Sequence, residues 1–300
     1  MATAGRAPEG LIFSALMPHP PIVVPAVGGT RVDACRATLE ACRTVSRRLL
    51  EHRPERLLLV SPHAPRLRRE FGVFAGARYR GDLGRFGADD AAVNLPVDRE
   101  LAAALGTPTS ETADDAVAVR ALDDPRFCAA DHGAVVPLVF LAEAGWDGPT
   151  SVVSLPATPT DTQCVGFGRH VARTLERLDG RCALVASGDM SHRVLPGAPA
   201  GFDPRAVEFD HQLTDRIARG ALNQISSIDP ELRALAAEDA ADTCLIAAAA
   251  ASFEARGSAV LSYEHPFGVG YLVAVLFDRG VRLDRESMDR GPIDRRLGEC

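Results

Sequence analysis

Residues 11–25 read LIFSALMPHPPIVVP, a short apolar run that leads into a histidine framed by prolines, His19. The same arrangement recurs at residues 56–65, RLLLVSPHAP, where His63 follows a second apolar run. Apolar runs of this length that stop at a proline are typical of buried strands. Each predicted strand therefore places a histidine two residues beyond its end.

The segment between these two strands, residues 30–52, has a helical hydrophobic pattern. Apolar residues recur at steps of three and four, at Val32, Cys35, Leu39, Cys42, Val45 and Leu49. This spacing forms one face of an amphipathic helix. Strand, helix and strand make a βαβ unit, whose two strands run parallel inside an α/β sheet.

Apolar runs and helical patterns continue to alternate along the chain. The sequence predicts further strands at 150–155, 182–187, 258–263 and 270–277. It predicts helices at 98–105, from 132 onward, and at 160–178, 204–222 and 231–255. Glycines punctuate residues 70–96, which favours a strand-rich excursion there.

These patterns predict an α/β protein with a single domain, in which a central, mostly parallel sheet is flanked by helices. We expect this domain to cover residues 11–277, with a disordered N-terminus at 1–10 and a charged tail at 278–300. Ligands of such sheets bind beyond the carboxyl ends of the strands, so we expect the active site at that edge.

The composition excludes several classes of protein. The net charge of -7 over 300 residues lacks the basic character of nucleic-acid binders. The seven cysteines are scattered and form no CxxC pair, which argues against a disulfide framework. No N-terminal signal pattern and no apolar run of membrane-spanning length is present. We expect a soluble, cytoplasmic protein with no nucleic-acid partner.

A third predicted strand, residues 182–187, is followed by GDMSH, which carries Asp189 and His192. Since the carboxyl ends of parallel strands meet at one edge, His192 is expected to lie near His19 and His63. The prolines beside the latter two fix the backbone, which suits metal ligands. Two histidines and one carboxylate would leave coordination positions open on a divalent metal such as Fe(II).

The carboxylate is expected from residues 235–245, LAAEDAADTCL, which offer Glu238, Asp239 and Asp242. In a continuous helix Glu238 and Asp242 share a face. Glu264, at the end of the strand predicted at 258–263, is a separate candidate. The residue pattern alone leaves these alternatives open.

Five motifs in order, MPHPP, SPHAP, DHGAVVPL, SGDMSH and SYEHPFGVGYLVA, resemble the class III extradiol dioxygenase B-subunit family over residues 11–277. The β subunit of protocatechuate 4,5-dioxygenase belongs to that family, and the Memo proteins share its fold. The resemblance implies a non-haem Fe(II) enzyme that uses O2 to open the ring of a catechol-type or aminophenol substrate. Zinc or manganese are alternative metals, because both accept histidine and carboxylate ligands.

The resemblance also implies roles for individual residues. His19 and His63 match the family's histidine ligands, and our alignment places Asp242 at the position where the family usually carries a ligating glutamate. In Memo-like members a cysteine serves there, and Cys244 is two residues away.

Three more residues are assigned to catalysis. His192 matches the family's acid/base histidine, and His132, in DHG, matches a second active-site histidine. Asp189, three residues before His192, is expected to orient it or to hold a supporting hydrogen bond behind the metal ligands.

Two other functions stay open on the sequence. One is a Memo-like metal-binding or redox-regulatory protein without ring-cleaving activity, which a Cys244 ligand would favour. The other is a zinc hydrolase on the same scaffold. The family further implies either a homo-oligomer or a small partner subunit.

Overall fold

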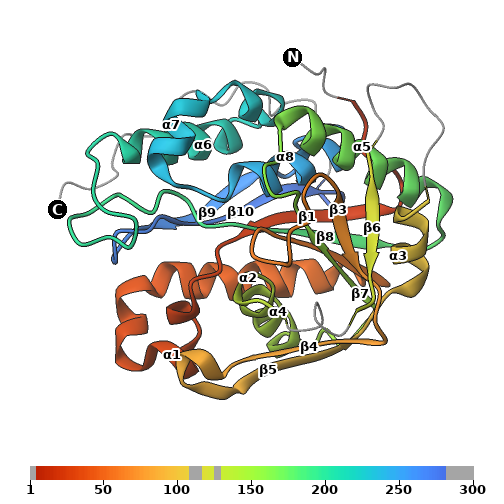
Figure 1. Cartoon of the computed structure of the whole chain (residues 1–300), viewed down its shortest axis with the longest axis horizontal. Coiled ribbons are helices and arrows are strands. Elements are labelled where there is room, and N and C mark those ends of the chain that lie inside the picture. The colour runs from red at the N-terminus through yellow and green to blue at the C-terminus, as the bar shows by residue number, and fades with distance from the viewer. Residues whose placement is uncertain (1–4, 108–116, 125–129, 282–300) are drawn as a thin grey trace.

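An eight-stranded mixed sheet runs through the middle of the molecule, with helices on both of its faces (Figure 1). The computed structural model describes residues 5–107, 117–124 and 130–281. The strand order is β6-β3-β7-β2-β8-β1-β10-β9, and β4 and β5 form a separate pair. The expected fold class, an α/β domain with a large and mostly parallel sheet, is confirmed.

The strands have these bounds: β1 Leu11–Met17, β2 Arg56–Ser61, β3 Phe71–Phe74, β4 Arg78–Leu83, β5 Ala88–Pro96, β6 Val119–Leu122, β7 Thr150–Ser154, β8 Cys182–Ser187, β9 Ala259–Glu264 and β10 Tyr271–Asp278. The four central strands β7, β2, β8 and β1 run parallel. Every residue of β1 and β8 is buried, which explains why both read as continuous apolar runs. Their shared direction brings the carboxyl ends of β1, β2 and β8 to one edge.

Two layers of helices cover the sheet. One face carries α1 Pro25–Gly28, α2 Arg36–Glu51 and α4 His132–Glu143, with the β4–β5 pair outside them (Figure 1). The other face carries α3 Arg99–Leu105, α5 Asp161–Arg177, α6 Ala206–Ala218, α7 Pro230–Ala236 and α8 Ala241–Ala250. Within the described ranges, no helix has the length and apolar character that a membrane crossing needs.

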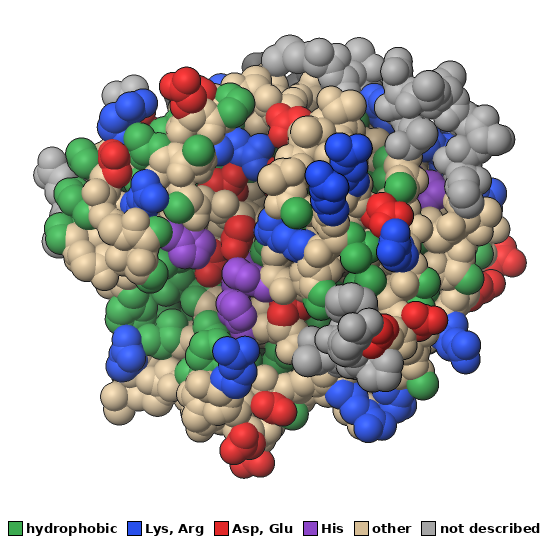
Figure 2. All heavy atoms as spheres, in the orientation of Figure 1, with side chains coloured by type: hydrophobic (Ala, Val, Ile, Leu, Met, Phe, Trp, Pro, Cys, Tyr) green, Lys and Arg blue, Asp and Glu red, His purple; other side chains and the backbone are tan. Residues whose placement is uncertain are grey.

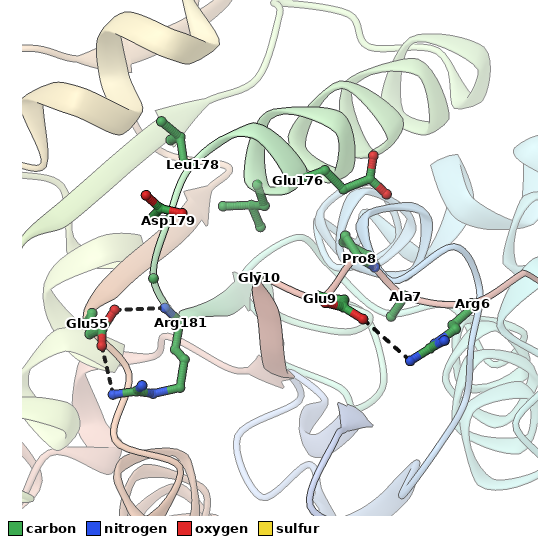
Figure 3. A pocket seen from close by; sticks show the side chains of 12 residues that line it. Arg6, Ala7, Pro8, Glu9, Gly10, Glu55, Glu176, Leu178, Asp179 and Arg181 are labelled. Atoms are coloured by element: carbon green, nitrogen blue, oxygen red, sulfur yellow. Dashed lines mark hydrogen bonds and ion pairs between the residues drawn. The ribbon is translucent and has the colours of Figure 1, made fainter.

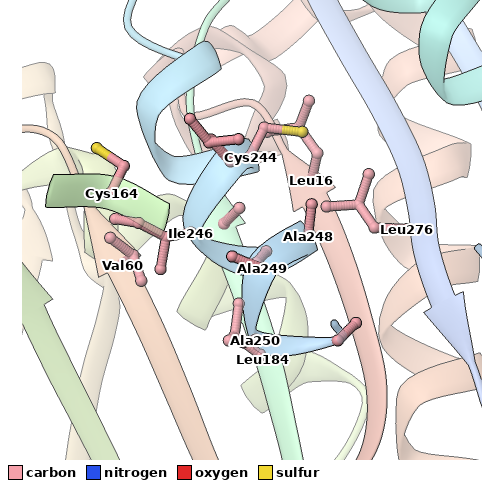
Figure 4. Packing of buried hydrophobic residues seen from close by; sticks show 14 of the residues in the cluster. Leu16, Val60, Cys164, Leu184, Cys244, Ile246, Ala248, Ala249, Ala250 and Leu276 are labelled. Carbon is pink, nitrogen blue, oxygen red and sulfur yellow. The ribbon is translucent and has the colours of Figure 1, made fainter. Parts of the chain in front are cut away.

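Helix α8 lies inside the protein, between α5 and the sheet. Figure 4 shows its side chains among Leu16, Val60 and Leu184 of the central strands. Its run of small residues permits a close approach to α5, where Gly168 faces the α8 backbone. A Cβ on Gly168 would lie 2.5 Å from the carbonyl oxygen of Ile246 and 2.6 Å from the Cβ of Ala249.

Replacing Gly168 by alanine is expected to lower the free energy of unfolding by about 1–3 kcal/mol, because α5 and α8 must move apart. Thermal or urea unfolding measures the change. Gly166→Ala is the matched control on the same helix, since its Cβ would meet only a side-chain methyl of Val117, at 3.1 Å. Alanine's higher helix propensity should leave that variant unchanged or raise its stability by up to about 1 kcal/mol. Equal losses in both variants would contradict the packing argument.

The helix predicted at 231–255 is wrong, because the structure contains two helices separated by a break. Helix α7 ends at Ala236, and Ala237 adopts a left-handed conformation with φ of 54°. Helix α8 then begins at Ala241, whose backbone N–H donates to Glu238 at 2.8 Å. Asp239 lies in this break, and its carboxylate faces His19 and His63 beyond the ends of β1 and β2.

The two ends of the chain also differ in part from expectation. Ala7 lies in the stretch expected to be disordered, yet it is buried and its backbone N–H donates to Glu254 at 2.7 Å. Asp278, assigned to the tail, is the buried last residue of β10. Residues 1–4 and 282–300 lie outside the described residues.

Candidate metal centre

Three histidines meet at the carboxyl edge of the sheet. His19 follows β1, His63 follows β2, and His132 is the first residue of α4. One ring nitrogen from each lies within 4.8 Å of the others, a spacing that can hold a metal ion. Figure 2 shows histidine and acidic side chains side by side near the middle of this face.

The hydrogen bonds of His19 fix which of its nitrogens faces the site. Ser187, the last residue of β8, donates its hydroxyl hydrogen to the carbonyl of Gly133, so its oxygen accepts from Nδ1 of His19 at 2.9 Å. Nδ1 is thus held by Ser187, and Nε2 faces the carboxylates of the site. Nε2 is buried and has no hydrogen-bond partner. This is the arrangement of a metal-ligating histidine held from behind by a hydrogen bond.

A carboxylate faces the same nitrogens. The Oδ2 atom of Asp239 lies 3.2 Å from Nε2 of His63 and 3.6 Å from Nε2 of His19. Its Oδ1 atom accepts the backbone N–H of Asp189 at 2.6 Å, which fixes its orientation. In the sequence analysis Asp239 was one of several candidates for the carboxylate ligand. The structure places it beside the two histidines.

The Asp189 carboxylate supports His19. Its Oδ1 accepts the backbone N–H of His19 at 2.9 Å, and its Oδ2 lies 3.7 Å from Nε2 of that residue. Of the two roles expected for Asp189, these contacts fit a supporting hydrogen bond to His19 rather than the orientation of His192. Burial raises the pKa of Asp189 overall, while the charges of His19 and, to a smaller extent, His192 act to lower it.

The electrostatics of the site favour a cation. Burial lowers the pKa of His19, but the negative charges of Asp189 and Asp239 outweigh it and raise the value to about 9. Burial alone would raise the pKa of Asp239, yet the neighbouring His19 and His63 hold it well below its usual range. Burial and the charges of His63 and His19 lower the pKa of His132 to about 4. Two imidazoles and a carboxylate suit a divalent first-row metal.

The structure does not bring Asp242 to the histidines. Its carboxylate pairs at 2.7 Å with Arg233, which also binds Glu238 at 2.7 Å and Asp161 at 3.0 Å. The alignment with the family assigned Asp242 as a ligand, whereas the structure pairs its carboxylate with Arg233. Asp242 and Glu238 instead stabilise the turn between α7 and α8.

The two remaining ligand candidates lie in other surroundings. Cys244 is fully buried in α8 among apolar side chains, and burial raises the pKa of its thiol far above the usual range. Glu264 accepts the backbone N–H and the hydroxyl of Thr38, at 2.8 and 2.6 Å, near the start of α2. Cys244 thus packs in the core and Glu264 holds the start of α2.

His192 lies in the loop after β8, half-buried, with its backbone N–H donated to Ala236 at 2.9 Å. Its Nδ1 atom is buried without a hydrogen-bond partner. No structural hydrogen bond therefore occupies Nδ1 of His192. An acid/base group needs a ring nitrogen that is available in this way.

Sequence reasoning missed two residues that position or flank the site. Asp131 caps α4, accepting from Ala134 N–H at 3.0 Å and from the Ser61 hydroxyl at 2.6 Å, and so fixes the start of His132's helix. Phe86, in the turn between β4 and β5, has its ring centroid 5.6 Å from that of His132 and is 43% exposed. The DHG motif offered a signal for Asp131, whereas nothing local marks Phe86.

A pocket lies elsewhere on the protein, away from the histidines. A pocket of about 770 Å³ is lined by Gly10, Glu55, Arg181 and their neighbours, with Glu55 and Arg181 paired at 2.9 Å (Figure 3). These residues precede β1, β2 and β8, so the pocket opens at the amino ends of the strands. The histidines lie at the opposite ends, and the pocket contributes nothing to their chemistry.

Comparison with known proteins gives three findings. A family model described as the catalytic LigB subunit of aromatic ring-opening dioxygenase matches residues 14–274. A Clostridium acetobutylicum protein named CA_C1420 is 26% identical over 268 residues, which cover 87% of this chain and 56% of the relative. An Escherichia coli 3,4-dihydroxyphenylacetate 2,3-dioxygenase is 29% identical over 110 residues, which cover 34% of this chain and 39% of that enzyme.

Both curated relatives are longer than the part that matches, so the chain spans about half of their length or less. Among solved structures, an uncharacterized protein from E. coli K12, JW3007, is similar with a TM-score of 0.55. The similarity covers 89% of this chain and all of that protein at 15% identity, and it concerns the fold alone.

Proposed function

The chain belongs to the family of catalytic LigB subunits of aromatic ring-opening dioxygenases, and from this membership we propose that it is an extradiol dioxygenase. Its substrate would be a catechol-type compound or an aminophenol, opened with O2 beside the pair of chelating groups. The relative that acts on 3,4-dihydroxyphenylacetate supports this reaction class. A cytoplasmic location and either a homo-oligomer or a small partner subunit complete the proposal.

His19, His63 and Asp239 are the proposed ligands of an Fe(II) ion. The observation that carries this assignment is the buried Nε2 of His19, which has no hydrogen-bond partner and faces the Asp239 carboxylate at 3.6 Å. When bound, the metal supplies Lewis-acid and redox chemistry to the substrate hydroxyls and O2. The protein supplies the remaining functions through its own side chains.

His192 is proposed to take a proton from a substrate hydroxyl and to return it later to the opened product. His132, with a pKa near 4, is a neutral imidazole at pH 7 and can donate or accept one hydrogen bond without adding charge. Asp131 and the helix that it caps hold His132 in place. Asp189 keeps the backbone of His19 fixed.

The test is anaerobic purification, metal analysis and reconstitution with Fe(II), followed by a panel of catechols, gallates and aminophenols. Iron-dependent oxygen uptake with a yellow ring-opened product would support the proposal. Tightly bound metal with no oxygen uptake on any member of the panel would contradict it. Activity restored by zinc alone, with hydrolysis and no oxygen uptake, would favour the hydrolase alternative.

Phe86 is expected to contact the ring of the substrate, because its own ring is exposed and adjoins His132. Phe86→Ala should raise KM by about 3- to 10-fold, as expected for the loss of one aromatic pair, with kcat changed less. Steady-state kinetics on the best substrate of the panel measures both constants.

Phe202→Ala is the matched control, since Phe202 is 52% exposed and makes no ring contact with a histidine among the described residues. Its KM should stay at the wild-type value. A KM for Phe86→Ala equal to that of the wild type would remove Phe86 from the substrate site.

A further inference from the structure

A buried carboxylate lies behind the loop that carries His192. Asp210, on α6, has no exposed surface. Its Oδ1 atom accepts the backbone N–H of Ser191 at 2.8 Å, and its Oδ2 atom accepts the hydroxyl of Tyr263, on β9, at 2.6 Å. Helix α6 and the edge strand β9 thus both connect to the residue that precedes His192.

The same loop is held on its other sides by backbone contacts. Gly270 N–H donates to the Ser191 carbonyl at 2.8 Å, and the backbone N–H of Met190 donates to the Gly270 carbonyl at 2.9 Å. Gly270 must lack a side chain, because a Cβ there would lie 2.2 Å from Oδ2 of Asp210. Ser191 and His192 both donate to the carbonyl of Ala236. The side chain of Asp210 is the ionisable member of this arrangement.

Burying this carboxylate is costly, since no ion pair to Asp210 exists among the described residues. Burial raises the pKa of Asp210 to about 7, even though the bonds from Tyr263 and Ser191 act to lower it. An apolar side chain of similar size would avoid this cost. The unfavourable free energy of burying Asp210 indicates a specific role for its carboxyl group, and its contacts suit that of fixing one backbone conformation.

We propose that Asp210 and Tyr263 are positioning residues that fix the backbone at Ser191 and thereby aim the imidazole of His192. Neither side chain is proposed to touch substrate or metal. The inference rests on the proposed function, because it takes His192 to be the acid/base group.

The kinetic test is a double-mutant cycle with Tyr263→Phe and Asp210→Asn, each made in the wild type and in His192→Ala. In the wild type, each change should lower kcat by about 10- to 100-fold, as a misplaced catalytic group does, with KM within about twofold. In the His192→Ala background neither change should lower kcat further by more than about twofold. Equal losses in both backgrounds would overturn the proposal, because a merely structural role does not depend on His192.

Asp98→Asn is the matched control. Asp98 is also buried and also accepts a backbone N–H, from Leu101 at 2.9 Å, but it lies beside Thr150 at the amino end of β7. The Asp98→Asn variant should lose stability as Asp210→Asn does, and its kcat should stay at the wild-type value. A loss of kcat in Asp98→Asn as large as in Asp210→Asn would mean that general destabilisation explains both.

A readout without turnover separates this inference from the proposed function. The imidazole Hε1 resonance of His192, assigned by its absence in His192→Ala, should shift or broaden in Tyr263→Phe and stay unchanged in Asp98→Asn. If the wild type opens no ring, the proposed function fails, and the resonance still decides whether Asp210 and Tyr263 position His192. An unchanged resonance in Tyr263→Phe would overturn the positioning role.

Discussion

Asp239→Ala is expected to lose its bound metal, with affinity reduced by more than about 100-fold, while Asp242→Asn binds metal as the wild type does. Asp239 faces the Nε2 atoms of both His19 and His63, and its replacement removes the carboxylate that the two imidazoles share. Asp242 is instead paired with Arg233 at 2.7 Å. Titration of the metal-free variants with Fe(II) under anaerobic conditions measures the affinities.

The pair of variants separates two ligand assignments that differ by three positions in the sequence. Metal loss in Asp242→Asn with retention in Asp239→Ala would restore the assignment expected from the sequence. His132→Ala completes the comparison, because an all-histidine site would need His132 as its third ligand. We expect His132→Ala to retain metal and to lose activity.

His192→Ala should retain its metal and lose about 100- to 10,000-fold in kcat, the usual contribution of general acid–base catalysis. His192 lies beyond the end of β8, and its Nδ1 has no structural partner to satisfy. The loss should therefore fall on the chemical step and leave folding and metal binding intact. Single-turnover measurements of ring opening, with metal content determined on the same sample, separate these effects.

His211→Ala serves as the control, since His211 is exposed on α6 and lies outside the histidine cluster. Its kcat should match the wild type. A His192→Ala enzyme with wild-type kcat would show that another group transfers the proton, and His132 would be the next candidate.

The strand ends were predictable because their signals are local. An apolar run followed by a proline marks the end of β1 and of β2, and the parallel arrangement then places His19 and His63 together. The break after α7 was not predictable in this way. Residues 235–245 are rich in alanine, which favours a continuous helix, and the left-handed turn at Ala237 is accompanied by an ion-pair network around Arg233.

The supporting contacts of the site were hidden for a related reason. The bond from His19 to Ser187 spans 168 positions in the sequence, and that between Asp210 and Tyr263 spans 53. No periodicity or motif reports a contact between residues so far apart. Phe86 likewise reaches His132 only because the β4–β5 pair packs on α4.

The break between α7 and α8 has a consequence for the order in which the protein matures. His19 and His63 come from the first βαβ unit, whereas Asp239 is supplied by the last quarter of the chain. A metal held by all three would act as a cross-link between the two ends of the polypeptide, and it could form only after both have docked. Its binding free energy would then add to the stability of the folded state, so that loading and folding are thermodynamically linked.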